Sequence, residues 1–220
     1  MAKVVIIDFR LGNLFSVIKA CEFCNITAKI SSNPLDIEKA DGLIIPGVGA
    51  FGEAMSNLRE LKLVYPIKDF AKSGRPIFGI CIGLQLLLSN SNEFGFTKGL
   101  DLIPGKVAKI EFDREKKVNK LKIPFIGWNK INFEKKSLFF SGIKNCSFFY
   151  FVHSFHGVLN NQKDQSSYST YGNLKITSSI ECENIFATQF HPEKSGMQGL
   201  KIYENWARKY NLSEDQRTNI

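Results

Sequence analysis

Short continuous apolar runs alternate, through the first third of the chain, with segments whose apolar positions recur every three or four residues. Val4–Asp8 is typical of a buried parallel strand, Ala28–Ile30 is a second short strand, and Leu43–Ile45 and Pro76–Ile80 follow as further apolar strands. Helical spacing separates them at Leu14, Val17, Ile18 and Cys21, within Ala54–Leu58 and within Val64–Lys72, and Ser31–Pro34 has turn composition. This alternation predicts an α/β fold, a mostly parallel central sheet flanked by helices.

The pattern changes after Gly105, where apolar runs follow one another without long helical segments between them. The predicted strands are Val107–Phe112, Lys130–Phe133, Phe148–Val152, Leu174–Ser178 and Ile185–Phe190. We expect them to form an antiparallel or mixed extension of the sheet, which the helical segment Ser195–Tyr210 then closes. Residues 1–210 are predicted to form a single domain, and the polar residues 211–220 a frayed tail.

Composition narrows the class of protein. The 220 residues are 44% hydrophobic, which suits one domain with a sizeable core. No apolar stretch approaches a membrane span, and Met1–Lys3 leads directly into the first strand without a signal peptide. Five scattered cysteines, an odd number, fit reduced thiols in a cytoplasmic protein.

The formal net charge of +8 raises the question of a nucleic-acid partner. Many of the lysines fall in Lys106–Lys136, where they are mixed with acidic residues. Mixed-sign charge is typical of an ordinary solvated surface, so we interpret the segment as a hairpin or loop edge and expect no nucleic acid. A docking face for an acidic partner protein stays open as an alternative.

The most informative stretch is Pro76–Gln85, where an apolar strand stops at Cys81 between Gly79 and Gly83. The helical pattern that follows places Leu84, Leu87 and Leu88 on one side, which predicts a strand, a sharp turn and a helix. The related serine pattern, G-x-S-x-G, exposes a nucleophile on a strained turn. A helix N-terminus behind the cysteine favours the thiolate and offers a backbone N–H to an oxyanion. Taken alone, the cysteine is as readily a small buried apolar residue.

Two further groups of residues could act together with Cys81 in catalysis. Asp8, Gly47–Gly49 and Cys81 all follow predicted parallel strands, so one crevice at the sheet edge is expected to hold them. The glycine-rich loop can turn backbone N–H groups toward an oxyanion, and it lacks the spacing of a nucleotide-binding loop. His191 and Glu193 stand two apart in an extended stretch and can lie side by side. A thiol, an imidazole and an orienting carboxylate are the parts of nucleophilic acyl transfer.

At this point the chain resembles a known family. Gly79–Gln85 and Gln189–Gly196 are similar to the motifs of class I, triad-type glutamine amidotransferases. Further segments resemble the glutaminase subunits of imidazole glycerol phosphate synthases: Asp8 with Gly12–Val17, Pro46–Phe51, Gly127–Asn129 and Tyr150–Ser154. The resemblance covers about residues 4–208, nearly the whole chain.

The resemblance implies hydrolysis of L-glutamine, with ammonia passed to a partner and no cofactor or metal. It implies that Cys81 is the nucleophile, His191 the general base and acid, and Glu193 the residue that orients the imidazole. It further implies oxyanion N–H groups from Val48 and Ile82, glutamine binding by Gly49, Gln85, Glu93 and Ser154, and a partner contact at Trp128. The implied partner is a separate (β/α)8-barrel synthase subunit in a heterodimer, which closes an imidazole ring in histidine biosynthesis.

The sequence departs from the family pattern at three places. These departures put in question which partner receives the ammonia, and not the glutaminase chemistry. Phe9 and Arg10 replace the usual Tyr-Gly after Asp8, Phe125 replaces the usual histidine after Pro124, and Phe155 with His156 follows Ser154. Arg10 and Phe125 are expected near the partner face. A paralogous subunit that feeds a surface-polysaccharide sugar amidotransferase therefore stays open, as does a non-catalytic interaction subunit.

Other features are interpreted structurally. Cys21 and Cys24 form a C-x-x-C without a second pair, which favours a helix in the core over a redox or metal site. His156 is expected at the surface, and Phe148–Phe151 is interpreted as a buried strand.

Overall fold

The computed structural model describes residues 3–111 and 121–213, and its largest sheet has eight strands in the order β2-β1-β3-β4-β14-β13-β12-β9. The parallel strands are β2 (Ala28–Ser31), β1 (Val4–Ile7), β3 (Gly42–Ile45), β4 (Ile77–Ile80) and β14 (Ile185–Thr188). The antiparallel extension comprises β13 (Leu174–Cys182), β12 (Gln165–Tyr171) and β9 (Asn132–Phe133). The predicted mostly parallel sheet with an antiparallel extension is thus confirmed.

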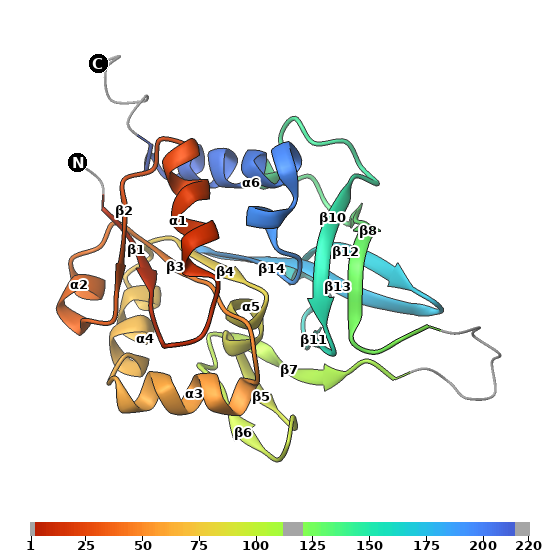
Figure 1. The fold of residues 1–220 in the computed structure, drawn as a ribbon, viewed down its shortest axis with the longest axis horizontal. Coiled ribbons are helices and arrows are strands. Elements are labelled where there is room, and N and C mark those ends of the chain that lie inside the picture. The colour runs from red at the N-terminus through yellow and green to blue at the C-terminus, as the bar shows by residue number, and fades with distance from the viewer. Residues whose placement is uncertain (1–2, 112–120, 214–220) are drawn as a thin grey trace.

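Helices cover both faces of the sheet, as expected for this fold class (Figure 1). Successive side chains of a strand point to opposite faces, so Val4 and Ile6 join one core cluster while Val5 and Ile7 join the other. The first cluster packs against α1 (Leu14–Phe23) and α6 (Gly196–Lys209). The second packs against α3 (Phe51–Glu60), α4 (Val64–Lys72) and α5 (Ile82–Leu86).

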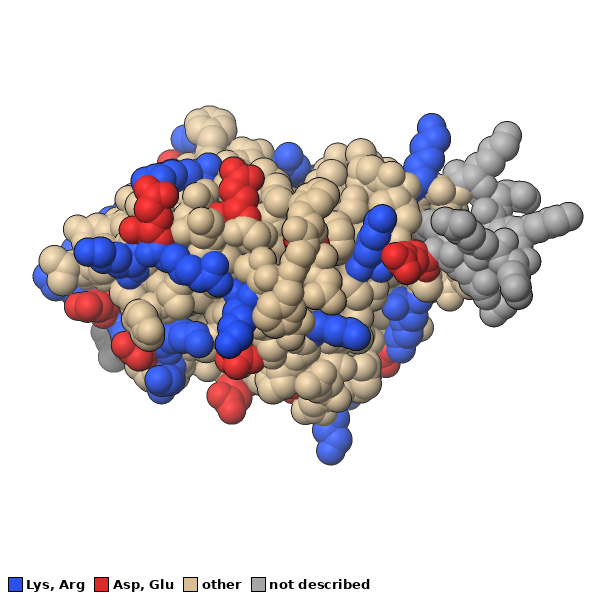
Figure 2. Space-filling model, turned by 90° about the horizontal axis from the view of Figure 1, so that it is seen from below, with Lys and Arg blue, Asp and Glu red and all other residues tan. Residues whose placement is uncertain are grey.

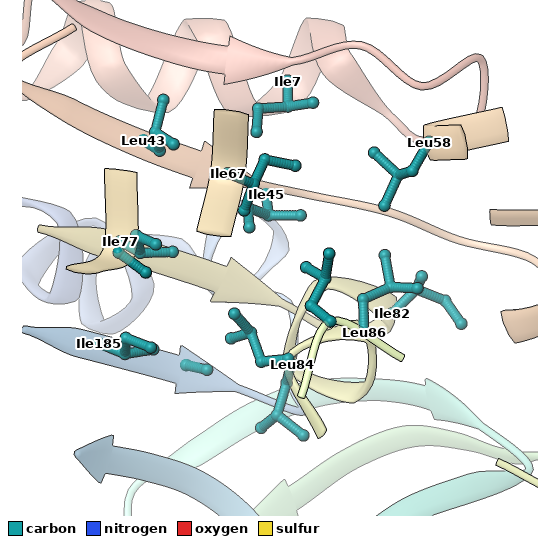
Figure 3. Packing of buried hydrophobic residues seen from close by; sticks show 14 of the residues in the cluster. Ile7, Leu43, Ile45, Leu58, Ile67, Ile77, Ile82, Leu84, Leu86 and Ile185 are labelled. Carbon is teal, nitrogen blue, oxygen red and sulfur yellow. The ribbon is translucent and has the colours of Figure 1, made fainter. Parts of the chain in front are cut away.

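The second cluster is the one that supports the cysteine turn. Figure 3 shows strand side chains such as Ile45 and Ile77 meeting Leu58 of α3, Ile67 of α4 and the apolar residues of α5. The labelled isoleucines and leucines of this cluster are all nearly fully buried. Close packing of this kind leaves the ends of β3 and β4 little freedom to move.

Two smaller sheets stand beside the antiparallel end of the main sheet. One pairs β8 (Phe125–Lys130) with β10 (Phe148–His153), and the other has the order β11-β7-β5-β6. The latter consists of β11 (Phe155–Leu159), β7 (Ile103–Lys109), β5 (Leu88–Ser91) and β6 (Thr97–Lys98). The predicted strands Val107–Phe112 and Phe148–Val152, which correspond to β7 and β10, therefore belong to these smaller sheets and not to the extension of the main sheet.

Several local predictions are corrected by backbone hydrogen bonding. The helix after Cys81 ends at Leu86, and Leu88 already belongs to β5. The carbonyls of Leu86, Leu87 and Leu88 accept N–H groups from residues 100–103, which fold back and stop the helix. The segment Ser31–Pro34 leads into a short helix, α2 (Pro34–Glu38), with Pro34 at its first position and Asn33 as its cap.

The region between β7 and β8 also differs from its prediction. β7 ends at Lys109 rather than Phe112, and Phe112 lies outside the described residues. β7 pairs with β11 and β5, and β8 pairs with β10, so these two strands do not form a hairpin with each other. On the face seen in Figure 2, a row of basic side chains at the left is bordered by acidic ones, and the other basic side chains stand apart from it.

The remaining helical segments of the described chain are three short 3-10 helices. The 3-10 helices are η1 (Leu138–Phe140), η2 (Gln162–Asp164) and η3 (Pro192–Lys194). The predicted tail is anchored where the structure describes it, because Leu212 is buried and Ser213 bridges to Ile26; residues 214–220 lie outside the described part. Within residues 3–111 and 121–213, no helix combines the length and apolar character needed to cross a membrane.

Candidate active site

Cys81 stands on a strained turn between β4 and α5. Its backbone dihedral angles are φ 54° and ψ −106°, a conformation that non-glycine residues rarely adopt. The backbone N–H of Cys81 donates to the carbonyl of Thr188 on β14 at 2.7 Å. The strain is therefore held in place by the neighbouring strand, and it presents the thiol at the carboxyl end of the sheet.

The two flanking glycines are required by close backbone approach. A Cβ at Gly83 would lie 1.7 Å from the carbonyl oxygen of Ile45, and one at Gly79 would lie 2.9 Å from Leu87 Cδ1. No side chain fits at position 83 without moving β3. The predicted glycine–cysteine–glycine turn is thus explained by the packing of α5 against the strands.

His191 follows β14, the strand that pairs with β4, so the Cys81 thiol and the His191 imidazole come from adjacent strand ends. His191 Nδ1 lies 2.8 Å from Glu193 Oε1, and both side chains are only 2% exposed. Glu193 sits in η3 rather than in an extended stretch, but the turn still returns its carboxylate to the ring. The side-by-side placement predicted for the pair is confirmed.

The loop that carries His191 is fixed to β10 through Tyr150 and Ser195. The backbone N–H of His191 donates to the Tyr150 carbonyl at 2.9 Å, and the Tyr150 N–H donates to Ser195 Oγ at 3.0 Å. The Ser195 hydroxyl in turn donates to the His191 carbonyl at 2.6 Å. These three bonds fix the backbone of His191 relative to β10.

The surroundings of His191 favour its protonated form. Burial lowers the pKa of His191, but the negative charge of Cys81 and its contact with the ring, together with Glu193, outweigh burial and raise the pKa to about 10. Its Nε2 atom is buried and makes no hydrogen bond of normal geometry in the free site. The charges around the ring thus favour an imidazolium, the form of histidine that can donate a proton.

A pocket of about 240 Å³ opens beside the sulfur of Cys81. Its wall combines the glycine-rich loop, the start of α5, the loop after β5 and the β10–β11 turn, namely Val48, Gly49, Cys81, Ile82, Gln85, Glu93, Pro124, Val152, His153, Ser154 and Phe155. The structure therefore brings together all four predicted glutamine-binding residues and both predicted oxyanion residues. His191 and Glu193 are not among the residues of this wall.

Gln85 connects the pocket to the nucleophile through a second glutamine. Its Nε2 donates to the Phe155 carbonyl at 2.9 Å and to Gln189 Oε1 at 3.1 Å. Gln189 Nε2 in turn lies 3.7 Å from Cys81 Sγ. Buried amides linked in this way fix the positions of the pocket wall and the sulfur relative to each other.

Glu93 ties the glycine-rich loop to the pocket. Its Oε2 accepts the backbone N–H of Phe51 at 2.7 Å, at the start of α3, where no side chain of the helix itself provides a cap. A carboxylate at a helix N-terminus is favourable, so this bond fixes where the loop ends. Gly49 in the same loop has φ 105°, a conformation open to glycine.

Some predicted residues do not reach the pocket. Asp8 is not in its wall, and accepts the Arg10 N–H at 2.8 Å instead. Arg10 is exposed and pairs with Glu60. Phe125, expected near a partner face, is buried because it stacks on Tyr171 and Phe151. Trp128 is 55% exposed on the outer face of β8.

The remaining interpretations are settled by burial. His156 is half-buried rather than at the surface. The strand Phe148–Phe151 alternates, with Phe149 and Phe151 fully buried and Phe148 half exposed. Cys21 in α1 and Cys24 at its end are buried, and burial raises the pKa of both thiols, as expected of core residues. In the described parts of the chain, no three His, Cys, Asp or Glu side chains are grouped to hold a metal ion.

Sequence reasoning missed five residues at the site, namely Gln189 and, in the pocket wall, Pro124, Val152, His153 and Phe155. Gln189 is the second residue before His191, inside the motif that carried the resemblance, and its contact with the sulfur makes it part of the site. His153 and Phe155 flank Ser154 in the pocket wall. Their signal was their position beside a predicted residue, at the turn between two strands, β10 and β11, of which only the first was predicted.

Comparison with known proteins agrees with this geometry. Residues 5–209 match the family described as glutamine amidotransferase class-I. The chain is 44% identical over 209 residues to imidazole glycerol phosphate synthase subunit HisH of Sulfurimonas denitrificans, covering 95% of this chain and 99% of that protein. It is 46% identical over 208 residues to the HisH subunit of Methanosarcina acetivorans, covering 94% and 98%.

Among solved structures, PurLQS from Thermotoga maritima matches with a TM-score of 0.68 and 17% identity, covering 94% of this chain and 98% of that one. A likeness at this identity concerns the fold alone. The family follows from the sequence matches, which extend over nearly the full length of both proteins. The chain therefore belongs to the class-I glutamine amidotransferases, in the group of the HisH subunits of imidazole glycerol phosphate synthase.

Proposed function

We propose that this chain is the glutaminase subunit of an imidazole glycerol phosphate synthase, which hydrolyses glutamine and passes the ammonia to a synthase partner in histidine biosynthesis. The observation that carries the proposal is the placement of Cys81 and His191 on adjacent strand ends, with Glu193 bonded to the far side of the imidazole. The HisH names of the relatives support the choice of acceptor.

The first half of the reaction releases ammonia. The Cys81 thiolate forms a bond to the carboxamide carbon of glutamine, and the carbonyl electron pair moves onto oxygen. Backbone N–H groups of Ile82, at the first residue of α5, and of Val48 stabilise this oxyanion. His191 gives its Nε2 proton to the carboxamide nitrogen, and the C–N bond breaks. Ammonia is released, and the acyl group stays bound to Cys81 as a thioester.

The second half regenerates the enzyme. His191, now neutral, takes a proton from water, whose oxygen adds to the thioester carbon. The C–S bond then breaks and releases glutamate and the thiolate. Glu193 keeps Nδ1 protonated and the ring oriented throughout, because its carboxylate can only accept that hydrogen bond. The net change is glutamine and water to glutamate and ammonia.

The outer face of β8 and β10 is proposed to receive the synthase subunit, a (β/α)8 barrel. Ile126 and Trp128 on β8 and Phe148 on β10 are each at least half exposed, and Trp128 contacts Tyr150 edge-on. Exposed aromatic and aliphatic side chains gathered on one face are typical of protein interfaces. The same two-stranded sheet continues into the pocket through Val152, so a partner seated here lies next to the ammonia source.

The proposal is tested by mixing the purified chain with the cyclase subunit of an imidazole glycerol phosphate synthase and its ribonucleotide ligand. Glutamine-dependent formation of imidazole glycerol phosphate is expected. Activation only by a sugar amidotransferase would reassign the acceptor. Glutamate release that continues unchanged in Cys81→Ala would remove the enzymatic assignment altogether.

The isolated chain is expected to turn over slowly. Free ammonia is lost to solvent without a partner, and the loop at Gly47–Gly49 can change its N–H orientation when the partner binds. Glutamate release measured with and without the synthase subunit checks this. High turnover of the chain by itself would contradict it.

A further inference from the structure

Two buried polar atoms, one on the triad carboxylate and one on α6, lack a hydrogen-bond partner among the described residues. The first is Glu193 Oε2, the oxygen that does not contact His191, and the second is the hydroxyl oxygen of Tyr203. The side chain of Glu193 is 2% exposed, and Tyr203 is fully buried. Buried polar atoms left unpaired are costly and call for an explanation.

The packing of α6 on η3 places these two side chains on facing surfaces. A Cβ at Gly199 would lie 1.8 Å from the carbonyl oxygen of Pro192, so the backbone of α6 touches the turn that carries Glu193. Tyr203 comes four residues after Gly199 and therefore lies on the same face of α6. Long side chains in a helix point back toward its N-terminus, which directs the Tyr203 hydroxyl toward η3.

The charges that act on the Tyr203 hydroxyl agree with this placement. Burial raises the pKa of Tyr203 well above its usual value, and the negative charge of Glu193 is the next largest cause. The hydroxyl therefore keeps its hydrogen and can donate it. Cys21 and Cys24 also contribute to the raised pKa, but the sulfur of a thiol is a weak acceptor. Of these three neighbours, the carboxylate is the strongest acceptor.

The ring of Tyr203 is held against the strand that leads to the nucleophile. It contacts Phe78 of β4 edge-on, with ring centroids 5.3 Å apart, and Phe78 precedes Cys81 by three residues. The last torsion of a glutamate side chain is soft by comparison, so a carboxylate held by only one oxygen can turn. A donor on a fixed ring removes that freedom at the second oxygen.

We propose that the Tyr203 hydroxyl donates a hydrogen bond to Glu193 Oε2, directly or through one water molecule, which makes Tyr203 a positioning residue of the triad. The inference deepens the proposed function and rests on it. A carboxylate only accepts hydrogen bonds, and its Oε1 already faces His191 Nδ1 at 2.8 Å, so Oε2 is left for a second donor. With both oxygens engaged, Glu193 keeps the imidazole in one orientation while the proton on Nε2 is given up and regained.

Tyr203→Phe tests this contact because it removes the hydroxyl and keeps the ring. In the complex with the synthase subunit, kcat for glutamine hydrolysis is expected to fall about 10-fold, while KM changes less than about twofold. The reason is that Glu193 acts on the imidazole and is not in the pocket wall. Tyr210→Phe is the matched control, the same change at the partly exposed end of the same helix, and should leave both constants unchanged.

A second measurement, the melting temperature of the full chain, needs no activity. If the hydroxyl is bonded to Oε2, Tyr203→Phe leaves that oxygen without a donor and should lower the melting temperature by about 2–4 °C. In a Glu193→Ala chain the same substitution should raise the melting temperature or leave it unchanged, because the hydroxyl has already lost its acceptor.

Three results would overturn the inference. A melting temperature that rises or stays the same in Tyr203→Phe would mean that the hydroxyl is not bonded to Glu193. An equal fall with and without the Glu193 carboxylate would mean that Tyr203 acts through packing alone. An unchanged kcat would mean that Tyr203 does not position the triad. Failure of the proposed function would appear instead as no glutamate release by the unsubstituted complex, and the melting temperatures would still decide whether the two side chains interact.

Discussion

The buried parallel strands and the strands of the two small sheets differ in how many of their faces are buried. Strands β1, β3, β4 and β14 are buried on both faces along their whole length. Strands β8 and β10 instead alternate, with one face in the core and the other presenting side chains such as Trp128. The first group, called here the parallel region, carries the nucleophile and the imidazole. The second, with β5–β7 and β11, supplies much of the pocket wall and is called the recognition region.

The two regions are expected to have different functions because their strands are packed differently. Residues buried on both faces hold Cys81 in a strained conformation that a looser frame would relax. Residues with one free face can contact glutamine or a partner while the other face stays anchored. Changes in the parallel region are therefore expected to act on turnover and folding, and changes in the recognition region on affinity.

The largest effect is expected from Cys81→Ala. Removal of the sulfur abolishes thioester formation and should lower kcat at least about 10⁴-fold, while glutamine binding is nearly unchanged. Glutamate release in the synthase complex and glutamine binding by calorimetry measure the two quantities. A large loss of binding with turnover retained would reverse the assignment of roles between the regions.

Glu193→Gln comes next. The amide no longer holds the protonated imidazole by charge, so the pKa of His191 should fall and kcat should drop roughly 100-fold or more. Titration of the His191 ring signal by NMR gives the pKa, and steady-state kinetics give the rate. An unchanged pKa of His191 would show that Glu193 does not stabilise the imidazolium.

Gly83→Ala tests the rigidity of the parallel region. The new Cβ would fall 1.7 Å from the Ile45 carbonyl oxygen, so β3 and α5 must separate, at about 3 kcal/mol or more in the free energy of unfolding. Gly52→Ala in α3 is the control, because its Cβ would meet Thr97 Oγ1 at an ordinary 3.5 Å. Urea unfolding compares them. Equal stability of the two variants would argue against a tightly packed frame.

Trp128→Ala tests the recognition region. The side chain is 55% exposed, so its removal should leave the unfolding free energy almost unchanged. Loss of a central aromatic contact should weaken binding of the synthase subunit by about 2 kcal/mol, roughly 30-fold in Kd. Lys98→Ala, at an exposed position on β6, is a suitable control. If both variants bound the synthase subunit equally well, the subunit would not contact the face that carries Trp128.

The last prediction concerns the pH dependence of stability. The pKa of His191 is raised in the folded chain from 6.5 to about 10, so its contribution to stability is complete below about pH 6.5 and disappears as the pH rises through about 10. Unfolding free energies measured on both sides of this window should fall more with pH in the native sequence than in His191→Asn. The same slope in both would contradict the raised pKa.

The parallel region was the more predictable of the two because its signals are local. The segments Val4–Asp8, Leu43–Ile45 and Pro76–Ile80 are short apolar runs of the kind found in strands buried on both faces, and topology alone placed Cys81, which follows Ile80, at the carboxyl edge of the sheet. Gln189 escaped prediction since its contact with the sulfur depends on β14 lying beside β4, a pairing between residues more than 100 positions apart.

The recognition region was less predictable for a physical reason. Its strands β5, β6 and β11 are short and carry mixed polar and apolar residues, so no periodicity marked them. The burial of Phe125 depends on stacking with Tyr171, which comes from the antiparallel extension of the main sheet. Such contacts are set by the three-dimensional arrangement, and a pattern along the chain does not contain them.

The three hydrogen bonds that join Tyr150, Ser195 and His191 connect the outside of β10 to the imidazole. Through these bonds, any displacement of the Tyr150 backbone by a protein docked on the outer face of β10 would be passed on to the loop that holds His191. Mechanical linkage of this kind works in both directions, since any shift that docking imposes on the imidazole is also imposed on the docking face by an occupied pocket. Glutamine in the site and the synthase on the surface should then strengthen each other's hold by the same factor.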